Sequence, residues 1–157
     1  MKAASISEIK AGLQDLPPLR LAALCLQLAK YKKDNKELLS YLLFEESDVA
    51  AYTAAVKTDM DEQFAAINTR QLYFAKKSLR KILRIAGKHI RYTGSKQVEA
   101  ELLIYFCQLM KNSGIQYTTS TVLMNLYQAQ LKKINAAIAG FHEEEQYDYL
   151  KEIKKLT

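Results

Sequence analysis

Apolar residues recur every three or four positions along nearly the whole chain, and no segment alternates strictly between apolar and polar residues. The first spacing is the period of an α-helix that buries one face, whereas alternation would indicate a β-strand. Turn signals at Pro17-Pro18, Asp34-Asn35 and Gly94-Ser95 separate the periodic segments. The pattern therefore predicts an all-α protein of about eight antiparallel helices joined by short connections.

Capping residues place the helix starts within this pattern. Ser5 and Glu8 form a capping-box sequence, and Pro18 suits the first turn of the next helix. Asn35, Asp48, Asn68-Thr69 and Ser120 are candidate N-caps further along the chain. The expected helices cover a short segment after Ser5 and the ranges 18–33, 36–46, 49–67, 69–93, 97–112, 121–139 and 143–156.

Two of the expected helices, 36–46 and 97–112, are apolar on nearly all sides, so both are predicted to be buried. They also share a short sequence repeat, because Glu37-Leu-Leu-Ser-Tyr41 recurs as Glu101-Leu-Leu-Ile-Tyr105. Two such helices flanked by amphipathic ones suit a short α-superhelix of helical hairpins, which resembles the HEAT or armadillo type in general plan. A compact up-and-down helical bundle is the alternative. The length is that of about one domain, so residues 1–157 are expected to form a single all-helical domain.

Charge is concentrated in one expected helix, 69–93. The chain contains 23 basic and 17 acidic residues, yet no acidic residue lies between Glu62 and Glu99. Nine Lys and Arg residues lie in that interval, so the remainder of the chain is slightly acidic. On a helical wheel the apolar residues of 69–93 share one side. The basic residues of the opposite side, the basic stripe, are Arg70, Lys77, Arg80, Lys81, Arg84, Lys88 and Arg91.

The basic stripe has three interpretations. It is a solvated face, a face paired with acids of neighbouring helices, or a site for a polyanion, most commonly nucleic acid. Tyr73, Phe74 and Tyr92 lie on or beside it and could stack on bases. Like charges four residues apart each destabilise an isolated helix by about 0.2–0.5 kcal/mol, so an anion would relieve them. The acids nearest in sequence are Asp59, Asp61, Glu62, Glu99 and Glu101.

No pattern of catalytic or metal-binding residues is present. Cys25 and Cys107 both lie among apolar neighbours, which predicts two buried thiols rather than a disulfide or a nucleophile. The cluster of His142 with Glu143–Glu145 lacks a metal-ligand spacing, and the acids already suit a helix N-terminus. His89, at the edge of the basic stripe, is expected to form a hydrogen bond rather than to catalyse. The sequence predicts no enzyme activity, no metal and no cofactor.

The favoured function is a non-enzymatic binding or scaffold module whose cationic helix, 69–93, contacts a polyanion such as nucleic acid. The alternative is a protein–protein interaction module that binds an acidic partner, with the basic stripe otherwise structural. A self-associating structural protein is a third option, and the sequence leaves the oligomeric state open. No apolar run is long enough for a membrane span and no secretory signal is present, so the cytoplasm is the expected location.

Overall fold

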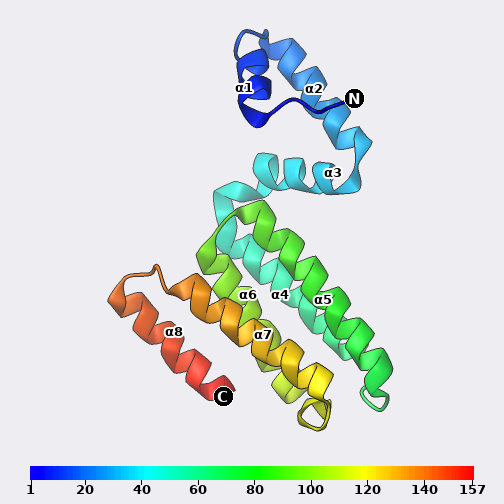
Figure 1. Cartoon of the computed structure of the whole chain (residues 1–157), viewed down its shortest axis with the longest axis vertical. Coiled ribbons are helices and arrows are strands. Elements are labelled where there is room, and N and C mark those ends of the chain that lie inside the picture. Colours follow the sequence, from blue (N-terminus) through cyan, green and yellow to red (C-terminus); the bar gives the residue numbers. More distant parts are fainter. The chain divides into compact units, whose positions relative to one another are not determined.

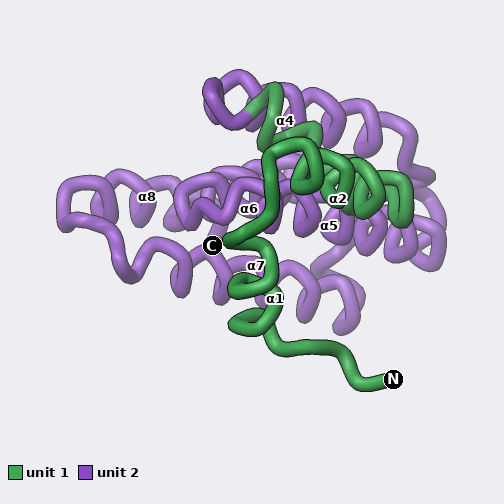
Figure 2. The backbone as a smooth tube through the Cα atoms, turned by 90° about the horizontal axis from the view of Figure 1, so that it is seen from above, with its two compact units in different colours: residues 1–45 green, residues 46–157 purple.

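The computed structural model describes residues 1–157, and all of its regular structure is helical, which confirms the all-α class (Figure 1). The chain forms two compact units, residues 1–45 and residues 46–157 (Figure 2). None of the helices is long and apolar enough to cross a bilayer. The single domain and the superhelical arrangement of hairpins remain predictions.

Unit 1 begins with the predicted capping box. The Oγ atom of Ser5 accepts a hydrogen bond from the backbone N–H of Glu8, and the backbone N–H of Ser5 donates to Glu8 Oε2 at 2.7 Å. The Ser5 hydroxyl also donates to Glu8 Oε2, and this bond together with the one from the Ser5 backbone N–H favours the ionised carboxylate and lowers the pKa of Glu8. The elements of unit 1 are α1 (Ile6–Gln14), α2 (Pro18–Tyr31), α3 (Lys33–Ser40) and one π-helical turn, η1 (Tyr41–Glu45).

The prediction for the helix 36–46 is wrong in two respects. Asn35 is not an N-cap, because it lies inside α3, where its Nδ2 donates to the backbone oxygen of Leu28 at 2.9 Å. The helix is also not buried on all sides, since Leu42 is 45% exposed and none of the residues of α3 is buried. The main neighbours of α3 are α2 and η1, and two neighbours leave part of an apolar helix uncovered.

Unit 2 is built around α6, which contacts every other α-helix of the unit. Figure 1 shows α4 and α5 running side by side in opposite directions, and α7 and α8 forming a second hairpin. Asp48, Ser95 and Ser120 cap their helices through side-chain oxygens. The elements are η2 (Glu46–Asp48), α4 (Val49–Ala65), α5 (Leu72–Thr93), α6 (Lys96–Asn112), η3 (Tyr117–Thr119), α7 (Thr121–Ile138) and α8 (Glu143–Leu156).

The core of unit 2 confirms the predicted burial of the helix 97–112. Leu102, Phe106 and Cys107 of α6 are completely buried, and the ring of Phe106 meets that of Phe64 edge to face at 5.4 Å between centroids. Burial raises the pKa of the Cys107 thiol to about 12, so this thiol stays neutral near pH 7. The sequence predicted that both thiols are buried, and for Cys25 this prediction is wrong. Cys25 is exposed, because neighbouring helices leave this side of α2 uncovered.

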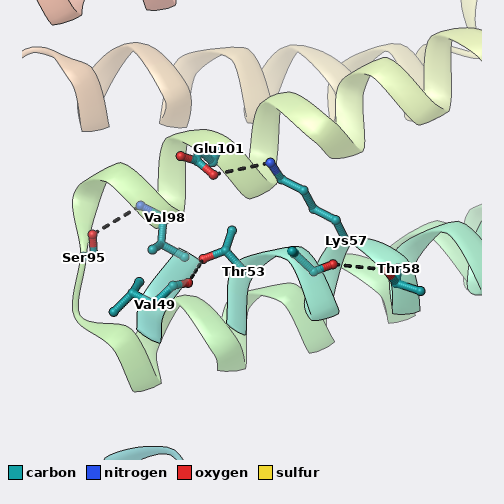
Figure 3. A network of polar contacts seen from close by, with 8 residues as sticks. Val49, Thr53, Lys57, Thr58, Ser95, Val98 and Glu101 are labelled. Carbon is teal, nitrogen blue, oxygen red and sulfur yellow. Dashed lines mark hydrogen bonds and ion pairs between the residues drawn. The ribbon is translucent and has the colours of Figure 1, made fainter. Parts of the chain in front are cut away.

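Polar contacts fix α4 against α6. Lys57 Nζ lies 3.3 Å from Glu101 Oε2, and around this ion pair Thr53 and Ser95 bond to backbone groups of their own helices (Figure 3). One turn further along, Tyr105 donates its hydroxyl proton to Asp61 Oδ1 at 2.6 Å. This hydrogen bond, with some burial and the nearby charge, raises the pKa of Tyr105. The acids of α4 and α6 therefore hold these two helices together.

Candidate functional site: the exposed side of α5

Helix α5 divides into a buried and an exposed side as the period of its sequence predicts. Ala75, Leu79, Ile82 and Ala86 are buried against unit 2. The helix ends at Gly94, whose φ of 61° is left-handed and is adopted readily only without a Cβ atom. The apolar side thus anchors α5 along its length and turns the opposite side outward.

The start of α5 differs from the prediction. The helix begins at Leu72, with Gln71 as an N-cap that makes no side-chain hydrogen bond, so Asn68-Thr69 does not cap it. Asn68 Oδ1 instead accepts a hydrogen bond from the backbone N–H of Arg70 within the connection. Arg70 therefore precedes the helix, and the basic stripe on α5 itself starts at Lys77.

Most of the basic stripe is exposed and carries no ion pair. Lys88 is the exception in burial, since its side chain is half-buried. Near α5, Lys57 pairs with Glu101 and Lys96 pairs with Glu99, and neither lysine belongs to the stripe. The exposed residues without an ion pair are Arg70, Lys77, Arg80, Lys81, Arg84 and Arg91.

The acids that could have paired with these six residues lie elsewhere. Asp61 accepts the hydrogen bond from Tyr105, Glu99 pairs with Lys96 at 2.7 Å, and Glu101 pairs with Lys57. Asp59 and Glu62 are exposed and make no ion pair with the stripe. The interpretation that neighbouring acids neutralise these six cations is therefore wrong, and the solvated face and the polyanion site remain.

An aromatic pair lies at the N-terminal end of α5. The side chains of Tyr73 and Phe74 are 58% and 49% exposed, and their rings meet at 5.4 Å between centroids. The Nζ atom of Lys77 lies 4.7 Å from the centroid of the Tyr73 ring, and that of Lys76 lies 5.9 Å away. Lys76 was not part of the predicted stripe, although its spacing of three residues from Tyr73 is the signal that could have included it. The end of the stripe thus offers an exposed ring beside two cations.

Tyr92, the other predicted stacking residue, has different surroundings. It is half-buried at the C-terminal end of α5, where its ring contacts His89 edge to face at 6.0 Å. The Nδ1 atom of His89 lies 2.6 Å from the hydroxyl oxygen of Tyr52 on α4, which confirms the predicted hydrogen bond of His89. Tyr92 therefore belongs to a packed aromatic group, and Tyr73 is the more accessible ring.

The length of the stripe sets the size of ligand that it can meet. From Lys77 to Arg91 the helix rises by about 21 Å, at about 1.5 Å per residue. One strand of B-form DNA places about six phosphates over that length, at about 3.4 Å each. The exposed cations are therefore numerous enough to neutralise several consecutive phosphates.

Comparison with known proteins returns no match to this chain. No family model matches it. Neither a curated protein nor a solved structure matches it. The interpretation of the basic stripe accordingly depends on its own charges, contacts and exposure.

Proposed function

We propose that this protein is a non-enzymatic binding module that holds a polyanion, above all nucleic acid, on the exposed side of α5. The observation that carries this proposal is the set of six exposed cations without an acidic partner. Charged surface residues usually alternate in sign, whereas this stripe has one sign over several helical turns. An anion that follows the helix would satisfy all of them together.

The like charges on α5 support the same proposal. Lys77 and Lys81, and Arg80 and Arg84, are spaced four residues apart and lie beside each other on the helix. Each pair destabilises an isolated helix by about 0.2–0.5 kcal/mol. The packed side of α5 offsets this repulsion in the free protein. A bound phosphate backbone would remove this repulsion, and the free energy released would add to the affinity for the anion.

The chemistry of the stripe favours contacts to phosphates over contacts to base edges. Lys and exposed Arg side chains on one convex helix neutralise phosphates and release counterions, and such contacts carry no sequence information. Tyr73 adds a ring on which an unpaired base can stack, so we expect single strands to bind at least as well as duplexes. We expect the module to act in the cytoplasm, as its sequence predicts.

The test measures binding of a fluorescent oligonucleotide to the whole chain as salt is raised. For four to six neutralised phosphates, a change from 50 to 200 mM salt should weaken binding on the order of 10²–10³-fold. Arg80→Glu with Arg84→Glu should abolish most binding at the lower salt, because both side chains point away from the buried side. Tyr73→Ala should weaken binding to single strands by about 1–3 kcal/mol and leave duplex binding less affected.

The matched control is Lys132→Glu with Lys133→Glu on α7. Both lysines are exposed, and the substitution changes the net charge by the same amount at a different surface. The control should retain binding, and both variants should keep the parent's thermal stability, since no ion pair is broken in either. Equal loss in the two variants would indicate unspecific attraction. Absence of binding by the parent at low salt would contradict the proposal and leave an acidic protein as the partner of the stripe.

A further inference from the structure

Unit 1 contains a groove that the basic stripe does not explain. The groove lies between α2 and α3, has a volume of about 740 Å³, and continues onto η1. Its floor is apolar, formed chiefly by Leu26, Leu39, Leu43 and Phe44, and its rim carries Lys30, Lys33 and Lys36. We call this feature the lysine-rimmed groove.

The apolar floor is unusually open to solvent. Leu43 and Phe44 are 63% and 75% exposed, and they follow Leu42 in a run of three exposed apolar residues. Such a run is normally excluded from a protein surface unless it serves binding. The run lies on a π-helical turn, a rare conformation that is frequent at functional sites. The backbone of η1 thus presents apolar side chains where an ordinary surface would carry polar ones.

The rim gives the groove a definite charge preference. Lys30 and Lys36 form no ion pair, whereas Lys33 lies 3.5 Å from Glu37 and remains largely exposed. Lys33 and Lys36 also lie in the first turn of α3, next to Asp34, at the end where the helix dipole is positive and disfavours cations. A negatively charged segment along the rim would meet both the lysines and the dipole favourably.

We propose that the lysine-rimmed groove binds an amphipathic α-helix of another protein, with apolar anchors along one face and acidic residues beside them. A groove between two helices that is apolar at its floor and charged at its rim receives such a helix through residues spaced three and four apart. The acidic flanks set the orientation of the helix against Lys30 and Lys36, and the anchors fill the space above Leu43 and Phe44.

The shape and charges of the groove favour this ligand over two others. A face that lies on a bilayer is typically the apolar side of one amphipathic helix, whereas the apolar residues here come from α2, α3 and η1 and line a groove between them. Within the chain itself, helices with several exposed apolar residues include α1, with Ile6, Ile9 and Leu13, and α8, with Tyr147 and Leu150. On α1 the residue next to the apolar side on the helical wheel is Lys10, a cation. Lys151 Nζ lies 4.3 Å from the centroid of the Tyr147 ring, so α8 of a second copy would bring a cation to the lysine rim.

The test presents the whole chain with a displayed library of helical peptides of about 20 residues, or about 30 Å of helix. Glu and Lys are equally frequent at the polar positions of this library. We expect the selected peptides to be acidic and to carry apolar residues three and four positions apart. A selected peptide, made synthetically, is then titrated against the parent and its variants by fluorescence anisotropy.

Two pairs of substitutions separate the apolar and the charged parts of the groove. Leu43→Ser with Phe44→Ser should weaken binding by about tenfold or more, as central anchors do. Lys30→Glu with Lys36→Glu should weaken binding of the acidic peptide. The same variant should bind more tightly a second peptide in which the Glu residues are replaced by Lys. The matched control, Ile6→Ser with Leu19→Ser, removes two apolar residues of unit 1 that are also mostly exposed but lie outside the groove, and it should bind like the parent. Circular dichroism checks that each variant keeps its helices.

Three results would overturn the proposal. The first is selection of peptides without an excess of acidic residues, or of peptides that bind the Leu43 and Phe44 variant equally well. The second is binding of the parent to vesicles rich in anionic phospholipid that is lost in this variant, without peptide binding. The third is a dimer of the parent in light scattering that Phe44→Ser dissociates, which would assign the groove to a second copy. These outcomes do not depend on the proposed nucleic-acid binding, because Arg80 and Arg84 lie on α5 and do not line the groove.

Discussion

Helices α3 and α6 have related sequences and opposite surroundings. Helix α6 and the segment formed by the end of α3 with η1 both contain a Glu-Leu-Leu-x-Tyr sequence, from Glu101 and from Glu37. In both cases apolar residues continue beyond it, as far as Met110 in α6 and as far as Phe44 in η1. Leu102 of α6 is completely buried, whereas the corresponding Leu38 of α3 is 37% exposed. The difference arises because α6 contacts four α-helices and α3 has α2 and η1 as its main neighbours. An apolar sequence therefore allows a helix to be buried, but the number of helices that pack against it decides whether it is.

The largest expected effect of this difference in burial is on the reactivity of the two cysteines. Cys25 of α2 is exposed, whereas Cys107 of α6 is buried and has its pKa raised to about 12. If Cys107 reacts only after unfolding, its reaction with a thiol reagent at pH 8 should be slower than that of Cys25 by a factor on the order of 10³ or more. Labelling kinetics followed by mass spectrometry measure both rates, with Cys25→Ser as the control that isolates Cys107. Similar rates would show that α6 is not the protected centre of unit 2.

Leucine truncation in the two helices should separate them in stability. Leu103→Ala in α6 removes a side chain that is 4% exposed, so it should lower the free energy of unfolding by about 2–5 kcal/mol. The burial predicted from the sequence for the helix 36–46 implies the same effect for Leu42→Ala in η1. Because Leu42 is nearly half exposed in the structure, we expect that substitution to cost less than about 1 kcal/mol. Urea unfolding of each variant gives both values, and equal effects would contradict the contrast between η1 and α6.

The hydrogen bond between Tyr105 and Asp61 should give a smaller, pH-dependent effect. Tyr105→Phe removes it and should cost about 0.5–1.5 kcal/mol at pH 7. The bond raises the pKa of Tyr105 above its ordinary value of 10.0, so its contribution is complete below pH 10.0 and disappears as the pH rises through the raised value.

The parent and Tyr105→Phe should therefore converge in thermal stability at alkaline pH. Asp61→Asn serves as the matched variant, because an amide oxygen still accepts the hydrogen bond but carries no charge. If the parent and Tyr105→Phe have the same thermal stability at pH 7 as well, the ring of Tyr105 acts by packing alone, because Phe keeps the ring.

The sequence alone determined which segments are helical and where several of them begin. Ser5, Asp48 and Ser120 cap their helices as predicted, because each cap depends on an oxygen and an N–H group three residues away. The two-sided character of α5 was also readable, since a period of 3.6 residues specifies its faces without a neighbour. Local spacing contains this information in full.

Tertiary structure decided what the helices cover and what their charges meet. Asn35 donates to the backbone oxygen of Leu28 on α2 instead of capping a helix, because the packing of α2 on α3 brings that oxygen within reach. Asn68 accepts from the N–H of Arg70, because the chain makes a turn there before α5 begins. The basic stripe stays open because the nearby acids bind elsewhere: Asp61 accepts from Tyr105, and Glu101 pairs with Lys57. In each pair the two residues are 44 positions apart in the sequence. Such pairings depend on helix packing, which brings residues together regardless of their separation in sequence, and the same packing buried α6 and left the groove of unit 1 open.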